Sequence, residues 1–217
     1  MQILQPFSGS IQEHSEQMAD PDRHRPDRCP QCEAPHPLTA HGFYRRTLVE
    51  MNCDGVIRVR RYLCHACKRT VSLWPEFALP SLRFGISVLS RFLVACLLQG
   101  QTLKASAAAA RQPHMPYQRG QFWVRRFRHQ AEALCLALAA LISTPPAASF
   151  LSRALRRLEA LGWIRSHRFL FSQWRVHLLG WPPFLAPAGR PATLPSPRSP
   201  SGSKTHSLGL APRPLLA

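Results

Sequence analysis

The chain has 217 residues and a formal net charge of +17, from 28 Lys and Arg against 11 Asp and Glu. Its longest apolar runs, Phe92–Leu98 and Ala133–Ile142, are far shorter than the roughly 20 residues of a membrane-spanning helix, and the first residues lack the basic and apolar regions of a secretory signal. Seven cysteines, an odd number, suit a reducing compartment, so we expect a soluble cytoplasmic protein with no membrane partner.

The charge is distributed unevenly along the chain. Residues 1–76 contain ten Lys and Arg against nine Asp and Glu, whereas residues 77–217 contain eighteen against two. A basic excess of this size is typical of a segment that binds a polyanion, with nucleic acid as the first candidate and an acidic membrane as the second. The alternative is a basic surface that is simply solvated.

Residues 1–27 form the first segment, which is polar, mixed in charge and rich in His, Gln, Asp and Pro. Segments of this composition bury too little apolar surface to offset the entropy of folding. We predict a disordered arm.

Residues 28–80 contain two Cys-x-x-Cys pairs separated by a predicted β-hairpin. One such pair also suits a redox dithiol, but two are typical of a zinc ribbon, in which four thiolates surround one Zn²⁺. The metal would stabilise a domain too small to fold by core burial alone. We predict one structural zinc ion with these ligands: Cys29, Cys32, Cys64 and Cys67. Three nearby histidines are possible substitutes: His36, His41 and His65.

The hairpin is predicted from residues that alternate between apolar and polar from Thr39 onward, on both sides of an Asp54-Gly55 turn. The second strand runs directly into the second cysteine pair. A third strand is expected over Thr70–Trp74, and the prolines that follow end the ribbon.

Residues 81–143 have the apolar period of helices. A first helix is expected to end at Gly100, and Thr102 can cap a short second helix, Leu103–Arg111. A third helix is expected over roughly Gln118–Ile142. A short helix, a turn and a basic helix in this order are typical of a helix-turn-helix domain.

The third helix has two different sides when its residues are placed at 100° intervals. Trp123 and Phe127 share one side, and Arg125 and Arg128 lie on the opposite side. Arg and Gln are the residue types that bind guanine and adenine edges through two hydrogen bonds. An ordinary amphipathic helix with a solvated basic face is the alternative. The predicted nucleic-acid contacts are Arg119, Gln121, Arg125, Arg126 and Arg128.

Residues 144–181 are expected to add one amphipathic helix and a Trp-rich segment without a clear pattern. Residues 182–217 are rich in Pro and contain no acidic residue, which predicts a disordered tail. The expected fold class is α+β, mostly α: a small zinc-ribbon hairpin domain followed by a helical domain, with disordered termini.

Several short motifs of the ribbon resemble those of a bacterial family of transposase-like zinc-ribbon proteins. They are Cys29-Pro-x-Cys32, His41-Gly42-x-Tyr44-x-Arg46, Ile57-x-Val59-x-Arg61-Tyr62-x-Cys64-x-x-Cys67, and Arg69-Thr70-x-Ser72 leading into Pro75-x-Phe77-x-Leu79-Pro80. The pattern is similar to the amino-terminal zinc-binding regions of insertion-sequence transposases, in which a ribbon precedes a helix-turn-helix. The resemblance covers about residues 28–142. It implies that the four cysteines bind the metal and that the protein binds DNA.

Complete transposases also have a catalytic domain with three metal-binding carboxylates. After Glu76 this chain contains only two acidic residues, Glu132 and Glu159, and two-metal phosphoryl chemistry needs a carboxylate cluster. We therefore expect no enzymatic activity.

The leading hypothesis is a zinc-dependent protein that binds duplex DNA, either a transposase-like recognition module or a regulator without nuclease activity. One alternative is a zinc-ribbon module that binds another protein. Another is an RNA-binding protein, in which Phe43 and Tyr44 would stack on bases.

Overall fold

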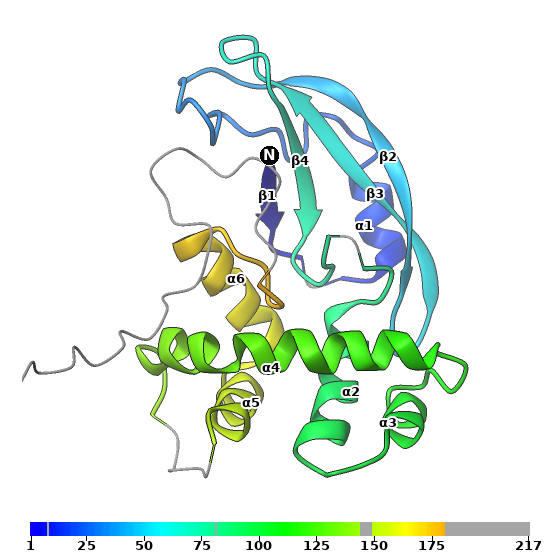
Figure 1. Cartoon of the computed structure of the whole chain (residues 1–217). Helices are drawn as coiled ribbons and strands as arrows, with labels where there is room; N and C mark the ends of the chain where they lie inside the picture. Colours follow the sequence, from blue (N-terminus) through cyan, green and yellow to red (C-terminus); the bar gives the residue numbers. More distant parts are fainter. Residues whose placement is uncertain (8, 81, 144–148, 181–217) are drawn as a thin grey trace, which may run out of the picture.

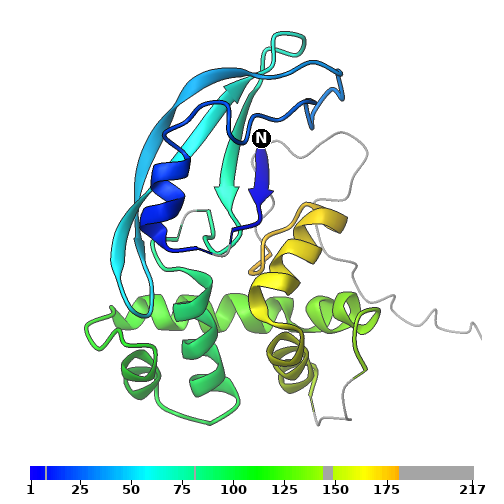
Figure 2. The same ribbon diagram turned by 180° about the vertical axis from the view of Figure 1, so that it is seen from behind.

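The computed structural model describes residues 1–7, 9–80, 82–143 and 149–180. These residues form a four-stranded sheet above a group of helices (Figure 1 and, from behind, Figure 2). The α+β class with more helix than strand is confirmed. The elements are β1 (Gln2–Gln5), α1 (Ile11–Gln17), β2 (Thr39–Val49), β3 (Asp54–Leu63), β4 (Thr70–Pro75), α2 (Ile86–Leu97), α3 (Leu103–Ala109), α4 (Tyr117–Ala139), α5 (Phe150–Leu161) and α6 (Trp163–Trp174).

The predicted hairpin and third strand are confirmed. β2 and β3 pair antiparallel with Tyr44 opposite Val59, and β3 pairs antiparallel with β4 with Arg61 opposite Ser72. The strand order is β1-β4-β3-β2, so β2 lies at one edge. The β2–β3 register shifts near Gly42, whose positive φ of 89° suits a residue without a side chain.

The prediction of a disordered arm over residues 1–27 is wrong. β1 pairs in parallel with β4, and Ser10 caps α1, because its side chain accepts a hydrogen bond from the Glu13 backbone. The Glu13 carboxylate in turn accepts one from the Ser10 backbone, which completes a capping box. The arm is ordered because its partners are supplied by strands much later in the chain.

The segment after α1 is attached to β3 by side-chain hydrogen bonds. The buried guanidinium of Arg60 donates to the carbonyl oxygen of Met18, and the Tyr62 hydroxyl donates to that of Pro21 at 3.1 Å. The residues that follow α1 therefore cover one face of the sheet, the face behind it in Figure 1, whereas Ile11 at the start of α1 packs with Ile57 and Val59 of the other face.

The helices pack around Trp123 of α4, which is fully buried. Phe84 and Phe92 meet its ring edge to face, with centroids 5.2 and 5.3 Å away. Gly120 allows this approach, because a Cβ at that position would lie 2.8 Å from the Phe92 ring. The expected helices are present with bounds shifted by a few residues, and Thr102 caps α3 by accepting a hydrogen bond from Ala105.

The Trp-rich segment contributes α6, which packs against both halves of the molecule. His167 contacts the carbonyl oxygen of Glu76 at 2.9 Å, and Arg175 donates to that of Gln2 at 2.6 Å. Val49 of the hairpin also belongs to the core formed by the helices. The sheet and the helices therefore share an interface. The predicted tail, residues 182–217, lies outside the described residues.

Candidate metal centre and basic helix

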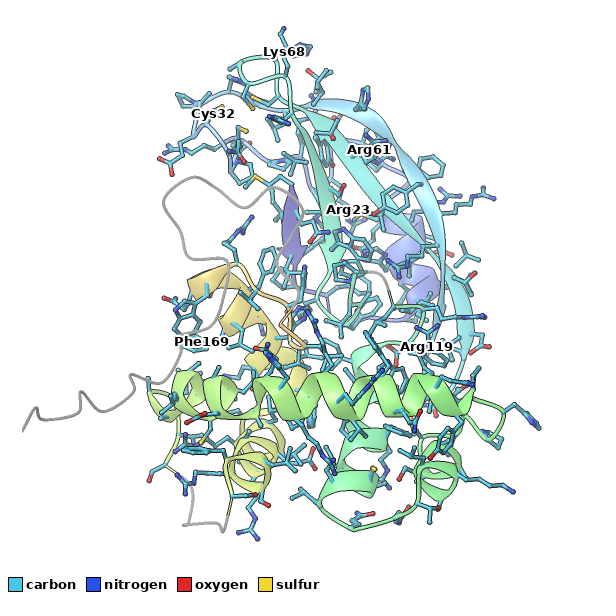
Figure 3. All side chains as sticks on the ribbon, in the orientation of Figure 1. Arg23, Cys32, Arg61, Lys68, Arg119 and Phe169 are labelled. Atoms are coloured by element: carbon cyan, nitrogen blue, oxygen red, sulfur yellow. The ribbon has the colours of Figure 1, made fainter. Side chains whose placement is uncertain are left out.

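The four predicted metal ligands come together at one end of the sheet. Their sulfur atoms all lie within 4.8 Å of one another, with 3.8 Å between Cys29 and Cys67 and 3.6 Å between Cys32 and Cys64. A four-coordinate ion with sulfur ligands at about 2.3 Å sets these separations near 3.8 Å. The cluster can therefore hold one metal ion in tetrahedral geometry. Figure 3 labels Cys32 at this end of the molecule.

The two cysteine pairs use the same local backbone geometry. The residue after each pair, Glu33 and Lys68, has a left-handed backbone with φ of 58° and 55°. The Cys29 amide donates to the Ala34 carbonyl at 3.3 Å, and the Cys64 amide donates to the Arg69 carbonyl, also five residues on, at 2.9 Å. Each turn therefore folds back on itself and directs both of its thiols to the same point.

The thiols differ in acidity. Burial disfavours the thiolate of Cys64, but hydrogen bonds from the Cys67 backbone and the neighbouring thiols outweigh it and lower the pKa of Cys64 to about 6. Burial and the same neighbours raise the pKa of Cys67 to about 12. One thiolate thus forms readily at neutral pH, and a bound cation would favour loss of the proton from the other three thiols.

Of the three histidines considered as substitutes, only His36 lies against the sulfur cluster among the described contacts. Its Nε2 is 3.7 Å from the Cys64 sulfur, whereas His65 Nε2 contacts the Thr39 hydroxyl at 2.9 Å. In the described part of the chain, one group of three or more His, Cys, Asp or Glu residues is placed to bind a metal, and it consists of the four cysteines. His41 does not belong to this group.

The predicted nucleic-acid contacts divide into two sets on α4. Gln121, Arg125 and Arg128 are exposed, on the side opposite the buried Trp123 and Phe127. This is the arrangement that the helical period predicted. The three side chains can reach a ligand without any change in the core.

Arg119 and Arg126 lie instead at the border of this exposed side and are half-buried. Arg126 donates through Nε to the Leu179 carbonyl at 2.9 Å and through a terminal nitrogen to that of Gly180 at 3.3 Å. It therefore holds the segment after α6 against α4. Figure 3 labels Arg119 over the amino-terminal half of α4, below the sheet.

The link between α3 and α4 differs from that of a compact helix-turn-helix. Residues 110–116 separate the two helices, whereas the usual turn has about three or four residues. α4 also has no side-chain cap at its first turn, where Pro116 precedes it. The arrangement is helix-turn-helix-like in order, with a longer turn.

Residues 29–112 match a family described as Domain of unknown function (DUF6431). The match includes the four cysteines, the hairpin, β4, α2 and α3, and it ends before α4. No curated protein and no solved structure matches the chain. The resemblance to transposase-like proteins therefore stays a prediction. None of the described helices combines the length and the apolar character needed to cross a membrane.

Proposed function

We propose that this protein is a zinc-stabilised protein that binds duplex DNA through α4, and that it has no nuclease activity of its own. The observation that carries the proposal is the exposed side of α4, where Gln121, Arg125 and Arg128 lie together opposite the core. Arg supplies both phosphate contacts and base-edge recognition, and Gln recognises adenine.

Zinc is the metal that best fits the cluster. Four thiolates are a soft donor set, and a closed tetrahedral site of this kind is structural rather than catalytic. The ion would hold the two cysteine turns together and so fix the end of the sheet.

The absence of nuclease chemistry is proposed from the acidic residues. Beyond Glu76 only Glu132 and Glu159 remain, and the Glu159 carboxylate accepts a hydrogen bond from the Trp163 indole. Two carboxylates on separate helices do not make the cluster that two-metal cleavage requires.

The alternative of RNA binding through stacked aromatics receives less support. Phe43 and Tyr44 are consecutive residues of β2 and point to opposite faces of the sheet. Arg58 lies over the Phe43 ring at 5.2 Å, and Tyr44 meets Trp74 edge to face. The two rings therefore do not form one stacking surface.

The proposal is tested by fluorescence anisotropy with zinc-loaded protein, a duplex DNA and a structured RNA of equal length. Binding to duplex DNA should weaken steeply with salt, with a slope of about −0.9 for each phosphate contacted. RNA should bind more weakly at every salt concentration. Equal or tighter binding to RNA, or no salt-dependent binding to DNA, would overturn the proposal.

A further inference from the structure

The face of the sheet opposite Arg60 and Tyr62, which bind the segment after α1, has its own set of polar side chains. Successive residues of a strand point to opposite faces, so cross-strand partners share a face. Arg61 is opposite Ser72, and Tyr44 is opposite Val59, two residues before Arg61. We call this the front face because it faces the viewer in Figure 1. Its polar residues are Tyr44, Arg46, Arg61, Thr70 and Ser72.

The part of the front face near the helices is buried, whereas the part near the metal centre is accessible. Ile57, Val59 and Trp74 are buried there in one cluster with Phe77 and with Ile11 of α1. On the edge strand β2, Tyr44 lies level with the buried Val59 and is 37% exposed. The part of the front face further toward the metal centre begins at Arg61. Arg61 and Ser72 are half-buried there, and Arg69, just before β4, is exposed.

Three guanidinium groups converge on this accessible part from distant segments. Arg61 lies on β3, Arg69 precedes β4, and Arg175 follows α6 and reaches the Gln2 carbonyl. The three lie around the start of β1: Ser72 is the cross-strand partner of both Arg61 and Gln2, and the Met1 amino group donates to the carbonyl of Thr70, the residue after Arg69. Among the described residues, neither Arg61 nor Arg69 forms an ion pair with a carboxylate. The positive charge here is therefore not neutralised by an acidic neighbour of either residue.

The front face and the exposed side of α4 lie on the same side of the molecule. α4 crosses in front of α2 and α5 in Figure 1 and behind α2 in Figure 2, whereas α1 lies behind the sheet in Figure 1 and in front of it in Figure 2. Figure 3 labels Arg61 on the sheet and Arg119 on the side of α4 that is nearer the sheet.

We propose that the front face is a second phosphate-binding surface for the same duplex, with Arg61 and Arg69 as its principal contacts. This inference rests on the proposed function of α4. Guanidinium groups bind phosphate through two parallel hydrogen bonds, and neighbouring hydroxyls of Tyr44 and Ser72 add donors. Because these contacts would be to the backbone, they extend the bound length of DNA without reading its sequence.

The test compares two double variants of the zinc-loaded full chain on two duplexes. Arg61→Gln with Arg69→Gln removes two charges from the front face. Arg45→Gln with Arg58→Gln removes two charges from the opposite face of the same sheet, where these residues form a cross-strand pair. One duplex has about 10 base pairs, a single helical turn that α4 can occupy alone, and the other has about 30, roughly three turns.

On the long duplex, the front-face variant should bind on the order of tenfold more weakly at moderate salt, and its salt slope should be shallower by about 2. On the short duplex it should bind like the wild type. The opposite-face variant should match the wild type on both. Zinc content and thermal unfolding, measured for both variants, should stay unchanged.

The inference is overturned if the front-face and opposite-face variants behave alike, or if the front-face variant weakens both duplexes equally. A wild-type protein that binds neither duplex would instead refute the proposed function. Wild-type binding to both duplexes with no effect of the front-face variant would refute only the second surface. These outcomes keep the two proposals distinguishable.

Discussion

The imidazole rings of His167 and His177 are joined in the protein interior by a hydrogen bond of 2.9 Å between Nε2 of the first and Nδ1 of the second. His167 Nδ1 lies 2.9 Å from the Glu76 carbonyl, which can only accept, so His167 donates there and accepts from His177. The Gln2 side-chain amide lies 2.7 Å from His177 Nε2 and completes the chain when its nitrogen donates. Both rings are then neutral. The chain of bonds joins α6 to β1 and to the end of β4.

This pair predicts a loss of stability in mild acid. Burial lowers the pKa of His167 to about 4, and burial together with His167 and Arg175 lowers that of His177. As the pH falls, the histidines of the unfolded chain bind protons before the buried rings of the folded protein do. The stability that the neutral rings contribute is therefore complete above about pH 6.5 and is lost as the pH falls toward 4. For His167 alone the loss is about 3 kcal/mol. Urea unfolding at pH 7 and pH 4.5 measures it.

His167→Gln is the control for the acid effect, because an amide can still donate to the Glu76 carbonyl but does not titrate. Other interactions near α6, among them the Arg168–Glu76 ion pair at 3.2 Å, are the same in both proteins. The variant should therefore be less stable at pH 7 but lose less stability between the two pH values. An equal loss of stability in the variant and the wild type would show that the histidines do not contribute to the destabilisation in acid.

The metal centre predicts a difference between two cysteine substitutions. Cys64→Ser removes a buried ligand of the four-sulfur cluster, whereas Cys96→Ser changes a partly buried thiol of α2 that packs in the helical core. Zinc binding in small domains contributes on the order of 10 kcal/mol of folding energy. Elemental analysis should find one zinc ion per chain in the wild type and in Cys96→Ser, and strongly reduced zinc in Cys64→Ser.

The destabilisation caused by metal loss should be confined to the part of the protein near the site. Cys29, Tyr62 and Val71 belong to a small core beside the metal centre, separate from the core around Trp123. Hydrogen exchange after chelation should therefore show loss of protection in β3 and β4 with protection retained in α2 and α4. Loss of protection across α4 would contradict the division into separate cores.

A buried carboxyl predicts the effect of a substitution at Gly85. Burial raises the pKa of Glu50 to about 7, and its carboxyl contacts the Ser87 hydroxyl and packs directly onto Gly85, the residue that precedes α2. A methyl group at Gly85 would collide with the Glu50 carboxyl. Gly85→Ala should destabilise the protein by about 1 kcal/mol, measured by urea unfolding, because the end of the Glu50 side chain must move aside.

The same substitution in a Glu50→Ala background separates this collision from a backbone effect. With the carboxyl absent, Gly85→Ala should cost much less, so the two substitutions should be coupled in a double-mutant cycle. The backbone at Gly85 has φ of −74°, which alanine adopts without strain. Additive costs would mean that the close contact does not determine the requirement for glycine.

The features predicted correctly from sequence depend on signals between close neighbours. The Asp54-Gly55 turn and the cysteine spacing are local patterns, and each is present as expected. β1 and α6 escaped prediction because their partners lie far along the chain: Gln2 pairs with Ser72, and Arg175 reaches back to Gln2. Short segments with such partners carry too little local information to be recognised.

The distribution of charge along the chain also concealed part of the basic surface. Residues 1–76 are nearly neutral in sum, yet Ser72 lies between Arg61 from this part and Gln2, whose carbonyl accepts from Arg175 of the basic part. A sum over sequence cannot show which charges the fold brings together. Arg126, one of the predicted nucleic-acid contacts, also donates to the Leu179 and Gly180 carbonyls, because a helical wheel does not show what packs at the border of a face.

The last prediction concerns the exposed side of α4. Arg125 and Arg128 lie opposite the buried Trp123, so replacing both with Ala should leave thermal unfolding nearly unchanged. It should weaken binding to the short duplex and make the salt slope shallower by about 2 if both arginines contact phosphates. If either binds a base edge, discrimination against a changed base pair should also fall, by about 1–3 kcal/mol. Anisotropy titrations over a salt series measure both effects.

The matched control removes two exposed arginines from the helices that pack on the other side of α4. Arg91 of α2 and Arg156 of α5 are exposed, so Arg91→Ala with Arg156→Ala gives the same change in net charge. If affinity depended on net charge alone, the two double variants would weaken binding equally. A selective loss in the α4 variant identifies this helix as the contact, because only position differs between the two proteins. Unchanged binding in the α4 variant would exclude α4 as the DNA-binding element while leaving the metal centre unaffected.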